Sequence, residues 1–252
     1  MSGSPALATR ELTRYFGGLA AVKDVSLECR KGEVHAVIGP NGAGKSTLLN
    51  VLSGDLPPSA GAVMLGGRDI TGFPAHRVSR LGVGRSYQKT NVFLPFTVFE
   101  NCRLAAQSRR RSSMRFFRPA LADRRVNEAA EQALHAAGLS GRGDRPVAAL
   151  SHGEQRQVEI AMVLATRPSV LLLDEPLAGM GAEESARMVE LLRSLAAGHA
   201  ILLVEHDMDA VFAVADVLTV MVSGTVLESG APESIRASRA VQEAYLGTEL
   251  SA

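Results

Sequence analysis

The clearest regularity in this chain is the alternation of continuous apolar runs with helically spaced apolar positions after Pro168. The apolar runs predicted to be strands are Val170–Leu173, Ile201–Val204 and Leu218–Val222. The helices predicted around them are Glu183–Ala197, Asp209–Val214 and a final one from Pro232 through about Tyr245. A turn at Ser223-Gly224-Thr225 is typical of a hairpin. Continuous apolar strands that alternate with helices indicate a parallel sheet covered on both faces.

Shorter strand-like runs dominate the chain up to about Leu65. Val34–Ile38 is a β-branched, apolar run of the buried-strand type, and the residues from Thr47 to Leu52 predict a helix that stops near Gly54. The other elements expected here are strands over Leu27–Arg30 and Ala62–Leu65 and a short helix from Pro74 to Gly82.

The middle of the chain, from about residue 89 to 165, changes to helical spacing. Helices are expected from Thr97 to about Gln107, from Asp123 to Ala137 before Gly138, and from Ser151 to Ala165. The arginine-rich stretch Arg109–Arg125 is interpreted as a solvated basic loop, with a position near lipid headgroups as the alternative. We therefore expect a mostly helical insert within an α/β domain.

Composition excludes several classes of protein but does not by itself indicate a function. The 252 residues are 46% hydrophobic and 21% charged, with a net charge of +1, so no overall field favours nucleic acid or an anionic membrane. Cys29 and Cys102 are too few for a disulfide framework, which favours reduced thiols in a cytosolic protein. No apolar run approaches the roughly 20 residues that cross a bilayer, and the first residues lack an export signal.

One glycine-rich turn, which we call the phosphate loop, carries the most specific chemistry. Its residues are Gly39, Pro40, Asn41, Gly42, Ala43, Gly44, Lys45, Ser46 and Thr47. Glycines allow consecutive backbone N–H groups and a helix N-terminus to face an anion. Lys45 adds a charge near the β- and γ-phosphates, and the Ser46 hydroxyl can join a Mg²⁺ shell. The pattern predicts nucleotide binding, with a structural glycine turn as the alternative.

Two carboxylates follow a buried strand. Asp174 and Glu175 come directly after Val170–Leu173, and ligands of parallel α/β sheets lie beyond the carboxyl ends of the strands. An Asp there can hold Mg²⁺ through water, and a Glu can poise an attacking water. The alternative is a strand that simply reaches solvent.

A second segment, Leu150-Ser151-His152-Gly153-Glu154-Gln155, begins the third helix of the insert. Ser151 is a good N-cap with Glu154 three residues later, so a capping box explains this segment structurally. A capped helix start is nevertheless also a site for an anion.

With these motifs in order, the sequence resembles the ATP-binding subunits of ABC transporters over nearly its whole length. The motifs that carry the resemblance are the phosphate loop, Gln88 after Ser86-Tyr87, the signature Leu150–Glu154, the strand end Asp174-Glu175-Pro176, and His206 in Glu205-His206-Asp207. The resemblance implies an α/β fold: a RecA-like P-loop NTPase core with a parallel sheet, a small antiparallel β subdomain and an inserted α-helical subdomain. It implies an ATP-binding domain over about 6–250, with the core at 6–88 and 166–230, the helical subdomain at 89–165 and a C-terminal helix at 232–246.

The resemblance also implies ATP and Mg²⁺ as cofactors and a role for single residues. The phosphate loop holds the phosphates. Ser46, Gln88 and Asp174 serve Mg²⁺, Glu175 orients the attacking water, and His206 contacts the γ-phosphate. Phe16 matches the aromatic residue that stacks on adenine, with Tyr15 or simple strand packing as alternatives.

Two copies arranged head to tail are implied as well, with Ser151, Gly153 and Glu154 of each copy closing on ATP held by the other. Two positions depart from the commonest pattern. Glu154 stands where glutamine is frequent, and Gln155 is a candidate to share its contact. Gly181 stands where aspartate or asparagine is frequent, which puts the coupling of the two ATP sites in doubt.

Closer similarities narrow the group to importers of branched-chain amino acids. The segments that resemble them are Phe16–Val22, Glu175–Met180, Glu205–Met208, and the ending from Gly230 to Gly247. Importers of urea and short-chain amides share Ser151-His152-Gly153, and lipopolysaccharide exporters share the ending. The implied partners are a second ATP-binding subunit, identical or paralogous, membrane permease subunits that contact Asn91–Phe96 and the insert, and indirectly a periplasmic binding protein. The implied location is the cytoplasmic face of the inner membrane.

Other classes of protein fit less well. Soluble ABC proteins that act on ribosomes or DNA usually carry paired ATP domains, a long coiled-coil insert or basic extensions, whereas this chain has one phosphate loop and little net charge. A small GTPase or kinase is disfavoured by the signature and His206. We therefore expect no nucleic-acid partner.

Overall fold

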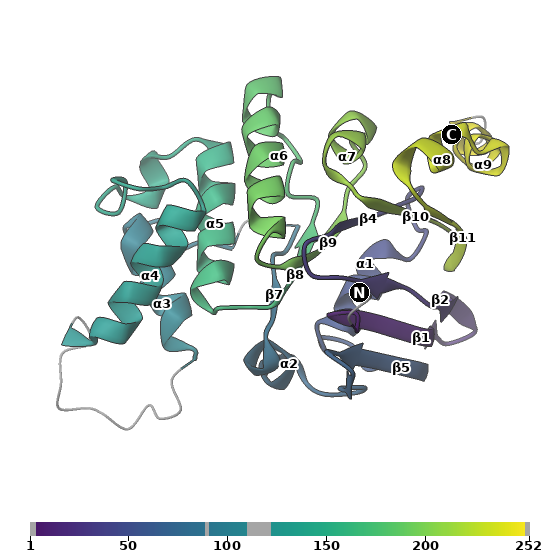
Figure 1. The fold of residues 1–252 in the computed structure, drawn as a ribbon, viewed down its shortest axis with the longest axis horizontal. Helices are drawn as coiled ribbons and strands as arrows, with labels where there is room; N and C mark the ends of the chain where they lie inside the picture. Colours follow the sequence, from purple (N-terminus) through teal and green to yellow (C-terminus); the bar gives the residue numbers. More distant parts are fainter. Residues whose placement is uncertain (1–3, 89–90, 110–121, 250–252) are drawn as a thin grey trace.

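The computed structural model describes residues 4–88, 91–109 and 122–249. Figure 1 shows three parts along the long axis: a helical layer at one end, a sheet with helices in the middle, and antiparallel strands at the other end. The basic residues 110–121, whose loop was interpreted from sequence, lie outside the described residues.

The central sheet has six strands in the order β11-β10-β4-β9-β8-β7 within the described part of the chain. Their bounds are β4 (Val34–Ile38), β7 (Val83–Arg85), β8 (Val170–Asp174), β9 (Ala200–Val204), β10 (Val217–Val222) and β11 (Thr225–Gly230). All neighbours pair in parallel except β10 and β11, which form the predicted hairpin. Every residue of β4, β8 and β9 is buried, which explains their continuous apolar runs.

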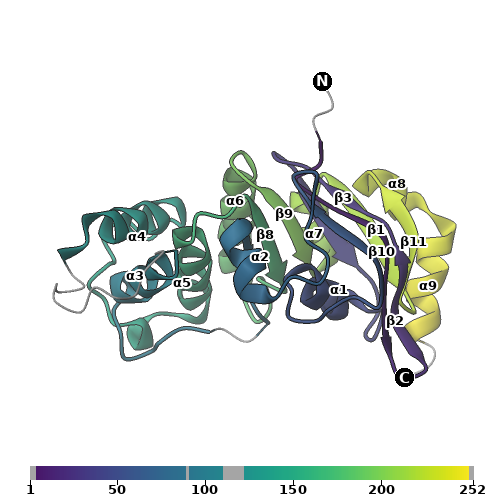
Figure 2. The same cartoon turned by 90° about the horizontal axis from the view of Figure 1, so that it is seen from below.

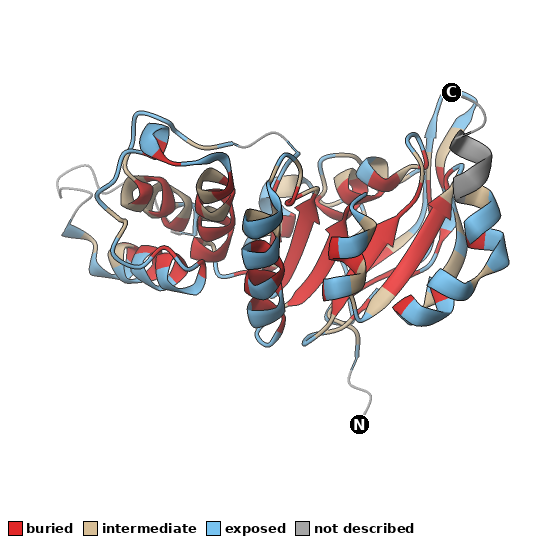
Figure 3. Ribbon diagram, turned by 90° about the horizontal axis from the view of Figure 1, so that it is seen from above, coloured by how far each residue is buried: buried red, intermediate tan, exposed pale blue. Residues whose placement is uncertain are grey.

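Helices cover both faces of this sheet, and Figure 3 shows the helices of one face lying over the red, buried strands. α6 (Ala182–Ala196) and α7 (Met208–Val214) pack on one face with residues such as Leu171 and Leu203. α1 (Lys45–Leu52) packs on the other with residues such as Leu172 and Leu202. The alternation of side chains along each strand therefore divides the core into two apolar clusters.

A second, antiparallel sheet lies on the far side of α1 (Figure 2). Its strands are β1 (Leu7–Phe16), β2 (Leu19–Val25), β3 (Glu28–Cys29), β5 (Ala60–Leu65) and β6 (Arg68–Asp69). Leu7 and Val22 join Leu48 and Leu52 of α1 in one cluster, so α1 is enclosed by both sheets. The strand predicted over Leu27–Arg30 is only the two-residue β3.

The helical layer consists of α3 (Val98–Gln107), α4 (Arg124–Ala136) and α5 (His152–Ala165), which pack on one another. Thr97, Asp123 and Ser151 each cap the helix that follows. The sequence predicted the cap at Ser151 and the helix starts near Thr97 and Asp123. A 3₁₀ turn, η2 (Val147–Ala149), precedes α5, and α2 (Ala75–Leu81) ends at Gly82. α5 also contacts β7 and α6, which connects this layer to the central sheet.

At the C-terminal end, the structure differs from the helix that was predicted. A single helix was expected from Pro232 to about Tyr245, but the structure has α8 (Pro232–Ala237) and α9 (Arg239–Glu249). Ser238 separates them because its backbone is extended, its hydroxyl donates to Glu228, and the same oxygen accepts the Val241 N–H. Among the described residues, no helix is both long and apolar enough to pass through a bilayer.

Candidate functional site

The phosphate loop connects β4 to α1 and is shaped by close backbone contacts. A Cβ on Gly39 would lie 2.1 Å from the Met221 carbonyl oxygen, and one on Gly44 would lie 2.2 Å from that of Ala21. Both glycines also have positive φ angles, of 153° and 99°. Only glycine fits these two positions, so the chain from Gly39 to Gly44 can follow its tight path.

α1 begins two residues earlier than predicted, at Lys45, and Gly44 gives it an N-cap without a side chain. The Lys45 ammonium donates hydrogen bonds to the carbonyl oxygens of Gly39 at 2.6 Å and Pro40 at 3.0 Å. Burial lowers the pKa of Lys45, whereas the nearby charges of Glu175 and Asp174 raise it. Ser46 is exposed at the same helix start. This edge therefore presents amides, a cation and a hydroxyl without a capping carboxylate.

Four residues predicted from separate motifs meet at the carboxyl ends of β7, β8 and β9. The Gln88 amide donates to Glu175 Oε2 at 3.1 Å, and His206 Nδ1 lies 3.8 Å from Glu175 Oε1. The His206 side chain is 63% exposed, so it faces solvent from this edge. Asp174, 4% exposed, is the last residue of β8, directly before Glu175. The structure thus brings Gln88, Asp174, Glu175 and His206 together.

The backbone of Glu175 has an unusual conformation, with a φ of 48°. Its N–H donates to the Val204 carbonyl at 2.8 Å, and its C=O accepts from Arg156 at 3.2 Å. Left-handed backbone at a non-glycine residue is strained and persists only where the surroundings impose it. The two hydrogen bonds provide that restraint at Glu175.

Burial and nearby charges have opposing effects on the pKa of the Asp174 carboxyl group. Burial raises its pKa, the Arg85 guanidinium opposes this rise, and Glu175 adds to it. Arg85 Nη2 lies 3.7 Å from Asp174 Oδ2, while Nη1 donates to Asp55 at 2.8 Å. The same guanidinium lies 4.7 Å from the centre of the Tyr87 ring. Arg85 therefore joins the end of α1, the end of β8 and the residue before Gln88.

The signature residues lie at the start of α5, in the helical layer, whereas the phosphate loop lies at the start of α1 (Figure 1). Ser151 and Glu154 form the predicted capping box. Glu154 also pairs with Arg142, and Gln155 donates instead to the carbonyls of Val147 and Leu150. The idea that Gln155 shares the contact of Glu154 with ATP of the other copy stays a prediction.

Glu184, in the first turn of α6, covers this helix start. The Ser151 hydroxyl donates to Glu184 Oε1 at 2.9 Å. A Cβ on Gly153 would lie 2.7 Å from the carboxyl carbon of Glu184. The bare backbone at Gly153 thus leaves a space for an anionic group, and the chain's own carboxylate fills it.

Phe16 lies at the end of β1 and is 45% exposed, as is Tyr15. The Arg14 guanidinium lies 4.9 Å from the centre of the Phe16 ring. Both rings are therefore partly exposed, and the role of Phe16 or Tyr15 in adenine binding stays a prediction beside simple strand packing.

Comparisons with known proteins agree with this arrangement. A family model described as "ABC transporter" matches residues 22–178, and one described as "Branched-chain amino acid ATP-binding cassette transporter" matches residues 225–250. The high-affinity branched-chain amino acid transport ATP-binding protein LivG of Salmonella typhimurium is 39% identical over 96% of this chain and 98% of its own length. The BraF protein of the same description from Pseudomonas aeruginosa is 39% identical over the same shares. A crystal structure of an ATP-binding cassette of an ABC transporter in its ADP conformation has a TM-score of 0.85 and 31% identity, covering 96% of this chain and 98% of that one.

The chain belongs to the ABC transporter family. It is an ATP-binding subunit that hydrolyses ATP to power transport, and its fold is that of the ABC cassette, with a RecA-like P-loop NTPase core. The fold class expected from sequence is thereby confirmed.

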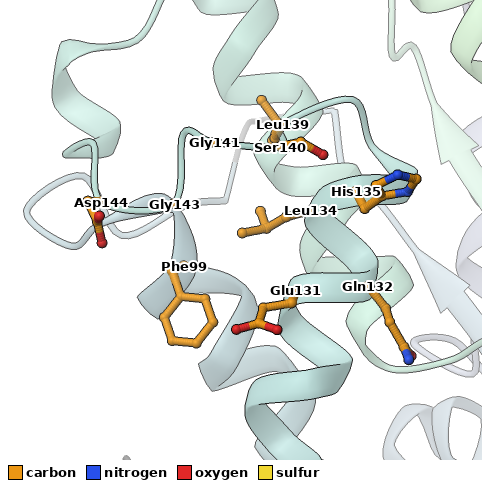
Figure 4. A pocket seen from close by; sticks show the side chains of 10 residues that line it. All are labelled: Phe99, Glu131, Gln132, Leu134, His135, Leu139, Ser140, Gly141, Gly143 and Asp144. Atoms are coloured by element: carbon orange, nitrogen blue, oxygen red, sulfur yellow. The ribbon is translucent and has the colours of Figure 1, made fainter.

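A pocket of about 720 Å³ in this ABC cassette lies elsewhere, within the helical layer (Figure 4). Phe99 of α3, Glu131 and Leu134 of α4, and the loop from Leu139 to Asp144 line it. None of the residues predicted to bind ATP lines this pocket. It is therefore separate from the strand edge where those residues gather.

Sequence reasoning missed three residues of the ABC site: Arg85, Arg156 and Glu184. Arg85 ends an otherwise apolar strand, and Arg156 lies on the buried side of α5, where it is 2% exposed. In both cases the signal available from sequence was a charged residue next to apolar positions of a strand or helix. Nothing in the local sequence around Glu184 distinguishes it from its exposed neighbour Glu183.

Proposed function

We propose that this chain powers the import of branched-chain amino acids, and that Glu175 is the residue on which its ATP hydrolysis depends. The observation that carries the proposal is the meeting of Gln88, Asp174, Glu175 and His206 at one sheet edge. That edge also holds the start of α1, since the charges of Asp174 and Glu175 act on Lys45. The identity to LivG and BraF supports the substrate class.

The roles follow from the chemistry of each group. Lys45 and the amides of residues 39–47 bind the phosphates as a cation and a set of N–H donors. Glu175 orients and polarises the attacking water, and His206 contacts the γ-phosphate from its exposed position. Phe16, exposed at the end of β1, stacks on adenine. Hydrolysis then depends on positioning and charge stabilisation.

The donor set fits Mg²⁺. Ser46 offers an exposed hydroxyl, Asp174 a carboxylate, and Gln88 an amide oxygen, while its amide nitrogen contacts Glu175. Mg²⁺ prefers oxygen ligands and is usually held by one or two carboxylates together with phosphates and water. When bound, it would neutralise phosphate charge during hydrolysis. The raised pKa of Asp174 is consistent with a carboxylate that lacks a full counter-charge.

We further propose a second ATP-binding subunit, identical or paralogous, which the positions of the two helix starts suited to anions support. The starts of α1 and α5 lie in different layers of one chain (Figures 1 and 2). In a head-to-tail pair, Ser151, Gly153 and Glu154 of one subunit would meet the γ-phosphate bound by the other. Glu184 would then leave Ser151, because the phosphate would take the place of Glu184 Oε1 as the acceptor of the Ser151 hydroxyl.

Membrane permease subunits are the proposed source of the transport path. Phe93, Leu94 and Phe96 are exposed, and the rings of Phe93 and Phe96 stack with centroids 5.6 Å apart. Exposed apolar residues grouped in this way typically mark a protein interface. Docking there would hold the chain at the cytoplasmic face of the membrane, where a periplasmic binding protein affects it only through the permease.

The experiment is to co-purify the chain with the permease subunits encoded beside it and measure its ATPase activity in proteoliposomes. We expect binding protein loaded with leucine, isoleucine or valine to stimulate hydrolysis, and Glu175→Gln to abolish the stimulated rate. Stimulation by urea or short-chain amides alone would contradict the substrate class. Full activity of Glu175→Gln would contradict the role of Glu175.

A further inference from the structure

Arg156 makes an unusual set of contacts for a residue in the middle of a helix. Its side chain is 2% exposed and lies one turn after the signature serine on α5. The guanidinium donates to the carbonyl oxygens of Tyr87 at 2.6 Å, Gln88 at 2.7 Å and Glu175 at 3.2 Å. One rigid group thus holds the main chain of two separate segments, beyond β7 and beyond β8.

Glu159, one turn further along α5, completes the arrangement. Glu159 Oε2 accepts from Arg156, and Oε1 accepts the Tyr87 N–H at 3.1 Å. Both backbone groups of Tyr87 are therefore held by the α5 ion pair. Both charged groups are almost fully buried, and a buried ion pair is seldom more stabilising than an apolar pair of the same size. Stability alone therefore does not explain this pair.

Two of the three carbonyls that Arg156 holds belong to Gln88 and Glu175, whose side chains meet. Gln88 Nε2 donates to Glu175 Oε2, and Glu175 carries the strained φ of 48°. A small rotation of the backbone at either residue would move the carboxylate away from the position set by β8. The guanidinium lies behind both residues and restrains both rotations.

We propose that Arg156 is a positioning residue for ATP hydrolysis: it fixes the main chain of Gln88 and Glu175 to each other and to α5. The inference rests on the proposed role of Glu175 in orienting water. Ser151 is the N-cap of the same helix, α5. If α5 moves when Ser151 contacts a phosphate, Arg156 moves with it and shifts the main chain of Gln88 and Glu175 in the same chain. Through Arg156, hydrolysis of the ATP bound by one chain then depends on whether the start of α5 in that chain contacts the ATP bound by the second chain.

The direct test is Arg156→Lys in the full-length chain. Lysine keeps the positive charge beside Glu159 but has no planar fork to reach both segments. We expect kcat for ATP hydrolysis to fall about 100-fold, since small misplacements of reacting groups cost this much. We expect the Kd for ATP to change less than about twofold, because the phosphate loop makes no contact with Arg156. Arg187→Lys, the same change at an exposed arginine of α6, should leave both unchanged.

A second variant covers the case in which Arg156→Lys does not fold. Arg156→Gln combined with Glu159→Gln removes both buried charges together and leaves neither unpaired. A structural role alone would lower the thermal midpoint, the ATP affinity and kcat together. The positioning role predicts that kcat falls at temperatures well below the midpoint while ATP affinity is retained.

The outcomes separate this inference from the proposed function. If Glu175→Gln loses hydrolysis while the folded Arg156 variants keep the wild-type kcat, the positioning role is wrong and the role of Glu175 stands. If Glu175→Gln hydrolyses ATP normally, the proposed function fails first, and the role of Arg156 fails with it.

Discussion

The starts of α1 and α5 are two helix N-termini suited to an anion, yet different side chains surround them. α1 begins after Gly44, which has no capping side chain, and Lys45 lies at its first position. α5 begins after Ser151, with a full capping box from Glu154 and a second carboxylate from Glu184. One start is left open for a ligand, and the other is occupied by the chain's own acids.

This difference indicates where an isolated chain can hold a nucleotide. Phosphate at α1 meets a cation and free amide donors and displaces no carboxylate. In the proposed dimer, phosphate at α5 would first have to replace Glu184, so we expect that start to contribute only when a second subunit brings its nucleotide close. We therefore expect the ATP affinity of a single chain to reside at α1, and the start of α5 to decide how readily two chains close.

The largest effect is expected for Glu175→Gln, which changes neither helix start. We expect kcat to fall about 1000-fold, because a neutral amide cannot accept a proton from water. ATP binding should persist, and dimers should accumulate with ATP. Phosphate release measures the first result and sedimentation the second. A variant that hydrolyses ATP slowly yet never dimerises would show that α5 plays no part in closure.

Lys45→Ala tests the open start directly. Removing the ammonium should weaken ATP binding by about 100-fold, the loss of charge-assisted hydrogen bonds worth roughly 3 kcal/mol. Titration with a fluorescent ATP analogue measures this affinity. Arg142→Ala, which removes a partner of Glu154 at the other start, is the control and should leave monomer affinity unchanged. Equal losses in both variants would remove the contrast between the two starts.

Glu184→Gln tests the occupied start. Removing this negative charge should lower the ATP concentration for half-maximal dimerisation by about fivefold, equivalent to roughly 1 kcal/mol. The measurement is sedimentation in a Glu175→Gln background. Glu183→Gln is the matched control, since Glu183 is exposed and pairs with Arg187 on the same helix. If Glu184→Gln hinders dimerisation instead, the carboxylate supports closure and does not compete with phosphate.

The smallest effect concerns a third helix start, that of α6. Gly181 is its N-cap, with φ and ψ of −74° and 166°, and a Cβ there would meet nothing within 4 Å. Gly181→Asn should raise the free energy of unfolding by a few tenths of a kcal/mol by adding a capping oxygen. Urea denaturation measures the change. Gly181→Ala, which has no such oxygen, should shift it in the opposite direction.

Local patterns predicted much of this molecule because they depend on neighbours in sequence. The buried strands β4 and β8, the helix start near Thr97, the cap at Ser151 and the glycine turn before α1 were all predicted from sequence. The motif order also indicated that Gln88, Glu175 and His206 belong to one site, although its contacts needed the fold.

Contacts between distant segments could not be predicted in the same way. Glu184 reaches Ser151 across 33 positions, and Arg156 reaches Tyr87 across 69. No rule of spacing selects Glu184 over Glu183, since only the packing of α6 beside α5 decides which of the two reaches Ser151. The break at Ser238 was missed for the same reason, because its hydroxyl is held by Glu228 on β11.

The neighbours of the phosphate loop have a consequence for how the protein is made. The loop is confined by the carbonyls of Ala21 and Met221, and the Gly224 N–H donates to the Ala43 carbonyl at 3.0 Å. A nascent chain on the ribosome carries residues 39–47 long before Met221 and Gly224 have been synthesised. We therefore expect ATP to be retained only by chains whose last strands, β10 and β11, have already docked, so that ATP binding would report on late folding.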